Sequence, residues 1–471
     1  MRGSTGWHYR PYRPANKLDE GQIPFICRIA PKAEGVEFEW FDNGAPDSAH
    51  VLEWRLIGIG LEWSSMPIDD AVVHLDSLQP YTEYEFRVIR AGAERVSSAV
   101  RLFRTGQAPG TVINYLHPKD DHYSFAGNSL NSPSLVRLPS GALLACMDLY
   151  KYPTPPVLGL IFRSDDNGAT WRYVTDVYPC FFGLLFVNKG RLYNLACSTM
   201  YGDFMISASD DEGYTWTTPT RLFPGTFQLP GGQGWAQAAM PILHHNGRLY
   251  TSVEYGSMPT YDVCVLSIDE DADLLDAANW YCSEPLKYDP KWPGTPNRMT
   301  RGGGLMEGNV LVSRDGRLLN LLRAGWEERT PERSIALLLE VDPERPEDKL
   351  TFHKYIDMPS GNNAKTYVLY DEVSDKYIAI GNICVDANYP SMRTVAALLV
   401  SDNIYDWKTV KIFIDFREED PTKVGFQYFT FIIDGDNILC MSRTAINNAL
   451  NHHDANHMTL HTIENFRQYL V

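Results

Sequence analysis

The chain has 471 residues, of which 44% are hydrophobic and 12% aromatic, so it is long enough for more than one structural unit with a substantial core. Lys and Arg number 42 against 59 Asp and Glu, a net charge of −17, which disfavours nucleic acid and anionic membranes as partners. No apolar run approaches the ~20 residues of a membrane helix, and no apolar region of a secretory signal is present. We therefore expect a cytoplasmic protein as written, or a secreted or periplasmic one if a leader was removed.

The N-terminal part divides into a tail and a small β-rich unit. Residues 1–20 are polar and contain prolines, and they are expected to form a tail. Short apolar strand patterns follow one another from residue 21 to residue 106. The run LQPYTEYEFRV at residues 78–88 resembles the fibronectin type III module, in which a turn leads into a strand with a corner tyrosine, here Tyr84. The resemblance implies a fibronectin type III-like β-sandwich over residues 21–106.

Two octets of the form S-x-D-x-G-x-T-W stand at residues 164–171 and 209–216. In this spacing Asp166 and Asp211 can accept backbone N–H bonds inside a tight turn, and the glycine tolerates positive φ. The closing tryptophan of each octet anchors the turn by burial. The octets are the Asp-box, or BNR repeat, and residues 111–471 are similar to the sialidase-like β-propeller superfamily that carries it.

A unit of apolar strand, glycine turn and second apolar strand recurs six times after residue 111. Each copy is followed by another strand pair, so every copy supplies four antiparallel strands. The predicted fold is therefore all-β: a six-bladed β-propeller, with a seventh blade left open, preceded by the β-sandwich. The strand at residues 111–116 is expected to complete the last blade.

The antiparallel order of each copy indicates which rim of the propeller carries the chemistry. Glycine turns and Asp-box hairpins fall on one rim, so the starts of first strands and the ends of second strands fall on the other. That second rim gathers carboxylates, arginines, tyrosines and a histidine, the ingredients of glycosidic-bond chemistry. The candidate catalytic residues are His453, Glu307, Asp148, Tyr255 and Glu254, and the candidate substrate-binding residues are Asn131, Arg323, Arg443, Arg301, Tyr428 and Tyr150.

The sialidase resemblance implies roles for two of these residues. Glu307 and Arg323 fit the places of a glutamate that polarises a nucleophilic tyrosine and of an arginine that binds the sugar carboxylate. Other positions depart from the family. Asn131 stands where an arginine is expected, and Phe426 stands where the tyrosine is expected, with Tyr428 two places on. The loop that should supply the acid/base aspartate contains no carboxylate, so sialosides are not expected to be cleaved.

Three functions remain open: a glycoside hydrolase that cleaves a non-sialic bond, a polysaccharide lyase that acts on a uronic-acid glycan by β-elimination, and a non-catalytic glycan-binding propeller. His453 is predicted as the acid/base, because an imidazole exchanges protons near neutral pH and Asp454 would orient it and raise its pKa. No metal-ligand spacing is evident and no cofactor is expected. The expected partner is an oligo- or polysaccharide.

Overall fold

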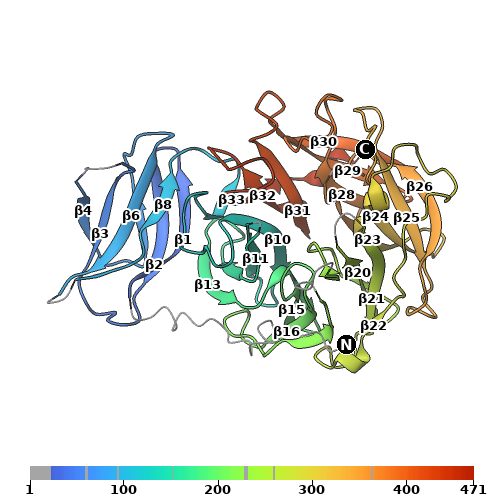
Figure 1. The fold of residues 1–471 in the computed structure, drawn as a ribbon, viewed down its shortest axis with the longest axis horizontal. Helices are drawn as coiled ribbons and strands as arrows, with labels where there is room; N and C mark the ends of the chain where they lie inside the picture. Colours follow the sequence, from blue (N-terminus) through green and yellow to red (C-terminus); the bar gives the residue numbers. More distant parts are fainter. Residues whose placement is uncertain are drawn as a thin grey trace.

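The computed structural model describes residues 23–58, 62–92, 95–151, 153–226, 232–257, 260–361 and 364–470. These residues form mainly β-strands, arranged as a small two-sheet unit beside a larger ring of sheets (Figure 1). The predicted tail at residues 1–20 lies outside the described residues. In the part of the chain that the structure describes, no helix is long and apolar enough to cross a membrane.

The small unit is a β-sandwich of β1 (Phe25–Lys32), β2 (Gly35–Phe41), β3 (His50–Leu56), β4 (Ser64–Ile68), β5 (Val72–Leu75), β6 (Glu83–Arg90), β7 (Val96–Ser97) and β8 (Arg101–Arg104). One sheet has the order β1-β2-β5 and the other β4-β3-β6-β7, with β8 also paired to β6. Apolar side chains of both sheets, such as Phe38 and Phe86, share one core. The hydroxyl of Tyr84 accepts a hydrogen bond from the N–H of Gln79 at 3.0 Å, as a corner tyrosine does. The fibronectin type III assignment stays a prediction.

Six further antiparallel sheets surround a common axis (Figure 1). The first three contain β10 (Ser129–Arg137), β11 (Leu143–Tyr150), β12 (Gly159–Ser164) and β13 (Arg172–Val177); β14 (Phe181–Asn188), β15 (Arg191–Cys197), β16 (Phe204–Ser209) and β17 (Thr220–Phe223); and β18 (Gly234–Ala236), β19 (Leu243–His245), β20 (Arg248–Gly256), β21 (Asp262–Asp269) and β22 (Tyr281–Cys282).

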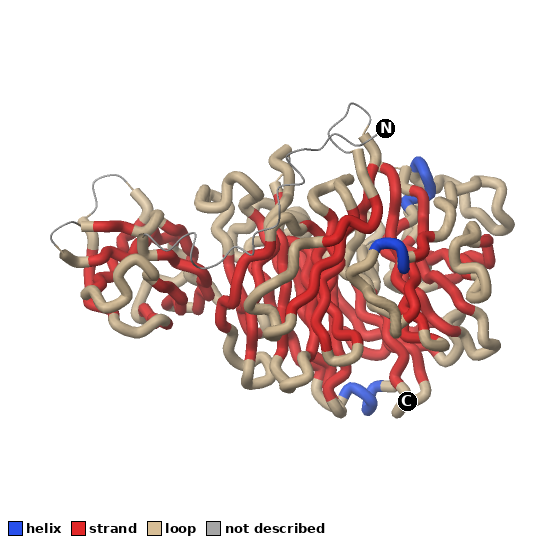
Figure 2. The backbone as a smooth tube through the Cα atoms, turned by 90° about the horizontal axis from the view of Figure 1, so that it is seen from below, coloured by secondary structure: helices blue, strands red, loops and turns tan. Residues whose placement is uncertain are grey.

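The next two contain β23 (Met306–Val312), β24 (Leu318–Arg323), β25 (Ile335–Val341) and β26 (Thr351–Asp357); and β27 (Tyr367–Asp371), β28 (Lys376–Asn382), β29 (Val395–Ser401) and β30 (Trp407–Asp415). The last contains β31 (Gly425–Asp434), β32 (Asn437–Ala445), β33 (His457–Ile463) and β9 (Thr111–Tyr115). The described residues also form short 3₁₀ helices (Figure 2): η1 (Ala277–Asn279) lies between two strands of the third sheet, η2 (Arg301–Gly304) lies between the third and fourth sheets, and η3 (Phe466–Tyr469) follows the last strand.

The ring is closed by two distant parts of the chain. β9 precedes the first blade in sequence, yet it pairs antiparallel with β33 of the last blade, with Met458 opposite Asn114. The sequence expectation that residues 111–116 complete the last blade is confirmed over the range of β9. The closing pair therefore joins the first and last parts of the propeller within one sheet.

Four first strands carry the same β-bulge near the axis. In β10, β14, β23 and β31 two residues oppose one on the neighbouring strand. The first bulged residue has positive φ each time: 34° at Ser132, 56° at Phe182, 60° at Glu307 and 57° at Tyr428. Side chains at positive φ are uncommon, so a bulge of this kind redirects a residue that regular alternation would place elsewhere.

Both Asp-boxes form the hairpin turns that their sequence predicts. The Asp166 carboxylate accepts the N–H of Thr170 at 2.8 Å and its hydroxyl at 2.6 Å, and the Trp171 indole is fully buried. Glu212 of the second box accepts the N–H of Ser140, which lies in the glycine turn of the first blade, at 3.3 Å. The boxes and the glycine turns therefore share one rim of the propeller.

The sandwich is packed on the first blade. Phe25 and Cys27 of β1 belong to the same apolar core as the interior of that blade. The buried Glu39 carboxylate accepts the N–H of Tyr173 at 2.7 Å, and Arg101 pairs with Asp120 at 2.7 Å, with both members of that pair buried. Apolar packing and buried polar contacts thus hold the two units together.

Candidate active site

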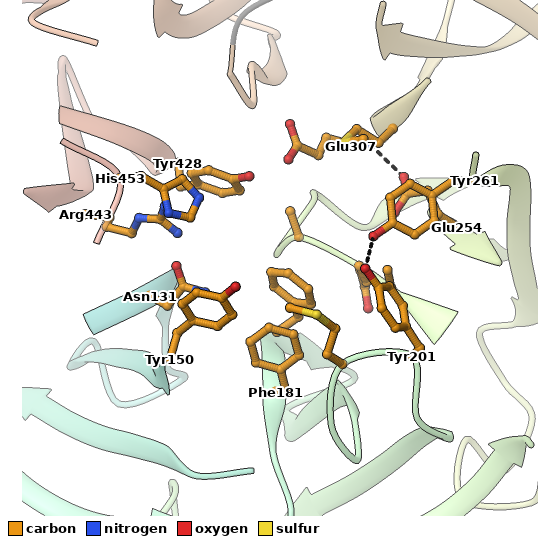
Figure 3. A pocket seen from close by; sticks show the side chains of 16 residues that line it. Asn131, Tyr150, Phe181, Tyr201, Glu254, Tyr261, Glu307, Tyr428, Arg443 and His453 are labelled. Atoms are coloured by element: carbon orange, nitrogen blue, oxygen red, sulfur yellow. Dashed lines mark hydrogen bonds between the residues drawn. The ribbon is translucent and has the colours of Figure 1, made fainter. Parts of the chain in front are cut away.

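A cavity of about 160 Å³ lies at the axis, on the rim opposite the Asp-boxes (Figure 3). It is built from the starts of first strands, the ends of second strands and the loops beyond them, as the antiparallel order of the repeats predicts. Its lining residues are Asn131, Tyr150, Phe181, Phe182, Met200, Tyr201, Ala236, Gln237, Ala238, Glu254, Tyr261, Met306, Glu307, Tyr428, Arg443 and His453.

Seven of the sequence-predicted site residues line this cavity: Asn131, Tyr150, Glu254, Glu307, Tyr428, Arg443 and His453. An eighth, Arg323, ends β24 and pairs with the Glu307 carboxylate at 2.8 Å. Three others, Asp148, Tyr255 and Arg301, are not among the lining residues.

The three exceptions have separate physical reasons. Tyr255 follows Glu254 on β20, so strand alternation turns its ring away from the cavity and onto Trp235, with 5.0 Å between ring centroids. Arg301 is exposed on η2. Asp148 is fully buried behind the cavity wall, where its carboxylate accepts the N–H of Phe182. Burial raises the pKa of Asp148 to about 8.

The centre of the site is a cluster of Glu307, Arg323 and Tyr428. Burial acts to raise the pKa of Glu307, but the charge and hydrogen bond of Arg323, together with a hydrogen bond from Tyr428, outweigh it, so the pKa lies below its usual value. Glu307 is therefore a carboxylate at neutral pH although it is only 4% exposed. Burial raises the pKa of the Tyr428 phenol, so this phenol is neutral and able to donate to Glu307.

Tyr428, predicted from the sequence as a substrate-binding residue, is the tyrosine partner of Glu307. Tyr428 lies two places beyond the position that the family pattern indicates, but it occupies the bulge of β31 and has positive φ. This conformation turns the ring to the axis, where its hydroxyl reaches Glu307. Phe426 is instead fully buried in the core of the fifth and sixth blades.

The carboxyl of Glu254 has the opposite character to that of Glu307. It ends a buried stretch of β20 and is 3% exposed. One of its oxygens accepts the backbone N–H of Glu307 at 2.6 Å. Burial raises the pKa of Glu254 to about 8, and the backbone N–H of Glu307 and the charge of Arg323 only partly offset the loss of water. At neutral pH the cavity therefore contains one protonated and one ionised carboxyl.

Two further arginines surround the Tyr428 ring. The guanidinium carbon of Arg443 lies 4.5 Å from the ring centroid and that of Arg393 lies 5.7 Å from it. Arg443 is 1% exposed, and its Nε and Nη2 have no hydrogen-bond partner among the described residues. A buried guanidinium remains charged, so the cavity presents positive charge to whatever occupies it.

His453 stands beside these arginines on the loop between β32 and β33. Its Nδ1 is 2.8 Å from the Asp454 carboxylate, and its ring meets the edge of Tyr150. The charge of Arg443, and then burial, lower the pKa of His453 to about 4, and the hydrogen bond to Asp454 only partly offsets this. Asp454 thus acts to raise the pKa of His453, as the sequence predicts, but Arg443 and burial outweigh it, and the imidazole is neutral at neutral pH.

Comparison with solved structures places the fold. The chain is similar to an α-L-arabinanase of Penicillium chrysogenum complexed with arabinobiose, at a TM-score of 0.50 and 16% identity, over 76% of this chain and 98% of that one. The likeness supports the fold alone, a β-propeller. The Hadza microbial sialidase Hz136 gives a TM-score of 0.49 at 14% identity over 94% of each chain, and a PL25 ulvan lyase gives 0.43 at 10% identity over 82% of this chain and 88% of that one. No protein-family model matches the chain, and no curated protein matches it.

Some cavity residues of this propeller were not singled out from the sequence. Arg393 is not among the lining residues, but it approaches the Tyr428 ring from the loop between β28 and β29, the same kind of loop as that of His453, and that common position was the available signal. Phe181 and Phe182 form an apolar wall at the bulge of β14. The hydroxyl of Tyr261 donates to that of Tyr201 at 3.3 Å, on a wall that had no charge to mark it (Figure 3). Within the described ranges, no group of three or more His, Cys, Asp and Glu side chains is arranged to hold a metal ion.

Proposed function

We propose that this chain is a carbohydrate-active enzyme, a glycoside hydrolase that removes an anionic, non-sialic sugar. The observation that carries the proposal is the pair of carboxyls in one cavity, with the pKa of Glu254 raised to about 8 and that of Glu307 lowered. Two carboxyls whose environments separate their pKa values are the arrangement that acid-assisted glycoside cleavage needs. The fold alone does not determine a reaction, so the proposal depends on these residues.

The roles follow from the protonation states. Glu254, as the neutral carboxyl, donates its proton to the glycosidic oxygen as the bond from that oxygen to the anomeric carbon breaks. The Tyr428 oxygen attacks the anomeric carbon and its proton passes to Glu307. Water then attacks the same carbon and gives a proton to Glu254, while Tyr428 leaves and regains its proton from Glu307. β20 and β31 belong to blades three and six, so the proposed acid and nucleophile stand on opposite sides of the cavity (Figure 3).

The arginines support an anionic substrate. Arg443 is buried, and two of its nitrogens have no partner among the described residues. An uncompensated buried charge is costly, and a sugar carboxylate would compensate it by charge-assisted hydrogen bonds. Asn131 still replaces an arginine of the sialidase pattern, and the loop after β11 supplies no acid, so we favour a uronate over a sialic acid.

Elimination by a lyase is the second candidate, and the neutral His453 favours it. A neutral imidazole can take the proton next to a uronate carboxylate, the leaving oxygen can take a proton from Tyr150, and the arginines would stabilise the carboxylate meanwhile. The difference from hydrolysis lies in the product. Elimination leaves an unsaturated uronide that absorbs ultraviolet light, and hydrolysis leaves only a new reducing end.

A panel of uronic-acid glycans and aryl uronides, read both for reducing ends and for ultraviolet absorbance, tests the proposal. We expect new reducing ends without absorbance, and an aryl sialoside in the same panel should stay intact. Glu254→Gln and Glu307→Gln should each lose ~100-fold or more of the turnover per folded molecule. Product that absorbs favours the lyase, sialic acid release rejects the non-sialic part, and binding of a glycan without cleavage favours a lectin.

A further inference from the structure

The first strand of the third blade is interrupted beside the cavity. β18 ends at Ala236 and β19 begins at Leu243, so residues 237–242 belong to no strand. Gln237 is the first residue of the interruption, and it lines the cavity. Its neighbour Ala236 pairs with Glu254 across β18 and β20, so Gln237 stands next to the proposed acid.

The Gln237 amide is buried without a protein partner. The residue is 1% exposed, and neither Oε1 nor Nε2 has a hydrogen-bond partner among the described residues. Asn309 of the next blade is equally buried, but its amide donates to the Thr366 carbonyl at 2.9 Å and accepts the Val368 N–H at 2.9 Å. Burial of an amide that makes no hydrogen bond costs ~1–3 kcal/mol. The buried Gln237 amide is therefore best explained by a ligand that enters the cavity and forms hydrogen bonds with it.

A hydrogen bond from Lys365 holds the interrupted segment in place. The Lys365 ammonium, fully buried at the start of the fifth blade, donates to the Ala239 carbonyl at 2.5 Å and to the Thr430 hydroxyl at 3.0 Å. Thr430 follows the bulge that carries Tyr428. One side chain therefore ties the Gln237 segment to the Tyr428 strand, which fixes the amide relative to the proposed nucleophile without using the amide itself.

We propose that Gln237 is a specificity-determining residue that forms hydrogen bonds with two adjacent hydroxyls of the sugar ring in the cavity. Side by side, its Nε2 offers a donor and its Oε1 an acceptor, which match one hydroxyl that accepts and a neighbouring hydroxyl that donates. The cavity of about 160 Å³ corresponds to roughly five water molecules, a space suited to one ring. This inference rests on the proposed function, since it places the same sugar that Glu254 and Tyr428 act on.

The inference predicts a particular pattern of discrimination. A site built to hydrogen-bond a hydroxyl rejects an analogue that lacks it, because the site's own polar group is then left unpaired. We expect the wild-type protein to bind a monodeoxy sugar ~10–100-fold more weakly than its parent. Gln237→Met keeps the length and removes both polar atoms, so it should bind the parent ~10–100-fold more weakly and no longer distinguish the deoxy analogue.

Two measurements test this on the full chain. The first is the melting temperature, which Gln237→Met should leave unchanged or raise, because the amide contributes no hydrogen bond to the free protein. Gln468→Met, on the exposed C-terminal turn, controls for the same side-chain change. A clear fall in the melting temperature of Gln237→Met alone would show a structural amide and overturn the inference.

The second measurement is titration of glucose, galactose, arabinose, glucuronate and galacturonate, each with its monodeoxy analogues, into the wild type and Gln237→Met. Binding by the wild type with discrimination that Gln237→Met loses supports the inference, and equal discrimination by both proteins rejects it. Failure of the wild type to bind any of these sugars also rejects it. Discrimination without cleavage would support the role of Gln237 in sugar binding and reject only the proposed hydrolase activity. Cleavage that Gln237→Met leaves unaffected would support the hydrolase and reject the role of Gln237.

Discussion

Glu254 and Glu307 are buried to the same degree in one cavity, yet their pKa values move in opposite directions. Burial dominates at Glu254, whose only strong compensation is one backbone N–H. At Glu307 the paired charge of Arg323 is stronger than the effect of burial. The sequence placed both residues on the same rim, but a pKa depends on the strand ends of other blades, and the pattern of one strand carries no information about them.

The pKa of Glu254 leads to a prediction about pH. Its folded value of about 8 lies above the unfolded value of ~4.3, so its contribution to stability is fully present below ~4.3 and is lost as pH rises through about 8. Urea unfolding of wild type and Glu254→Gln between pH 4 and pH 9 should therefore show the variant gaining stability relative to the wild type as pH rises. The exposed Glu284→Gln is the control and should run parallel to the wild type. Turnover should also fall as pH rises through about 8, as expected of an acid that must be protonated.

His453 gives a prediction that separates the two candidate reactions. With a pKa of about 4 the imidazole is neutral, so it cannot supply the proton that hydrolysis needs at neutral pH. For the hydrolase we expect His453→Ala to lose less than ~10-fold of the turnover, through weaker sugar binding alone. Kinetics of this variant beside His452→Ala, whose side chain is not among the cavity-lining residues, make the comparison. A loss of ~100-fold or more at unchanged melting temperature would contradict hydrolysis and favour elimination.

Local pattern predicted some site residues and missed others for identifiable reasons. Asn131, Tyr150 and Arg443 were placed correctly on one rim because they stand at strand starts and ends, which antiparallel order fixes. Tyr255 does not line the cavity because two adjacent residues of a strand without a bulge cannot both face the axis. Tyr428 was predicted as a site residue, but its contact with Glu307 could not be, because the bulge adds a residue to β31 and no spacing rule contains that extra residue.

At the scale of single elements, the bulges lie on the cavity rim of the propeller and the Asp-boxes lie on the opposite rim. The bulges give positive φ to Ser132, Phe182, Glu307 and Tyr428, and the last three of these line the cavity. The boxes lie on the other rim, where their turns contact the glycine turns of neighbouring blades. The octets could be predicted because the bonds that form each turn, such as those from Thr170 to Asp166, are local, whereas the bulges required knowledge of the partner strand.

Removal of an Asp-box carboxylate should weaken the fold without affecting the cavity. Asp166 accepts two bonds from Thr170, but it is exposed on the rim, so water can replace part of what is lost. We therefore expect Asp166→Ala to lower the free energy of unfolding by about 1 kcal/mol, with normal turnover per folded molecule. The adjacent Asp165→Ala removes a carboxylate whose contact is a surface ion pair with Arg163, and it should cost less. Equal losses in the two variants, or lost turnover in Asp166→Ala, would refute this role of the box.

For the whole molecule, the repeat made the ring of sheets predictable from the sequence. The contacts between distant parts of the chain could not be predicted in this way. Six similar sheets and their closing strand follow from strand spacing in the sequence. The docking of the sandwich depends on Glu39 and Arg101, which look like ordinary surface charges until Tyr173 and Asp120 are placed beside them. Contacts between distant parts of the chain have no local pattern, so sequence reasoning alone could not reach them.

Lys365 makes further long-range contacts, and they give a prediction for the propeller as a whole. Its ammonium binds Ala239 of blade three and the Thr430 hydroxyl of blade six, and that hydroxyl donates in turn to the Pro133 carbonyl of blade one at 2.7 Å. The pKa of Lys365 falls to about 7, because burial without a paired carboxylate disfavours the charged form. The unfolded chain holds the proton up to ~10.4, so between about 7 and ~10.4 the unfolded state binds more protons than the folded state.

Stability must therefore rise with pH across that window because of Lys365, and the rise should vanish in Lys365→Met. The measurement is the free energy of unfolding in urea at pH 7 and pH 9, taken as the difference between wild type and variant so that the opposite trends of Asp148 and Glu254 cancel. Lys376→Met, which removes a partly exposed lysine paired with Asp402 on the other rim, is the control and should not change the slope. If the stability of Lys365→Met changes with pH just as that of the wild type does, the amine is not held in the buried environment that joins blades one, three, five and six.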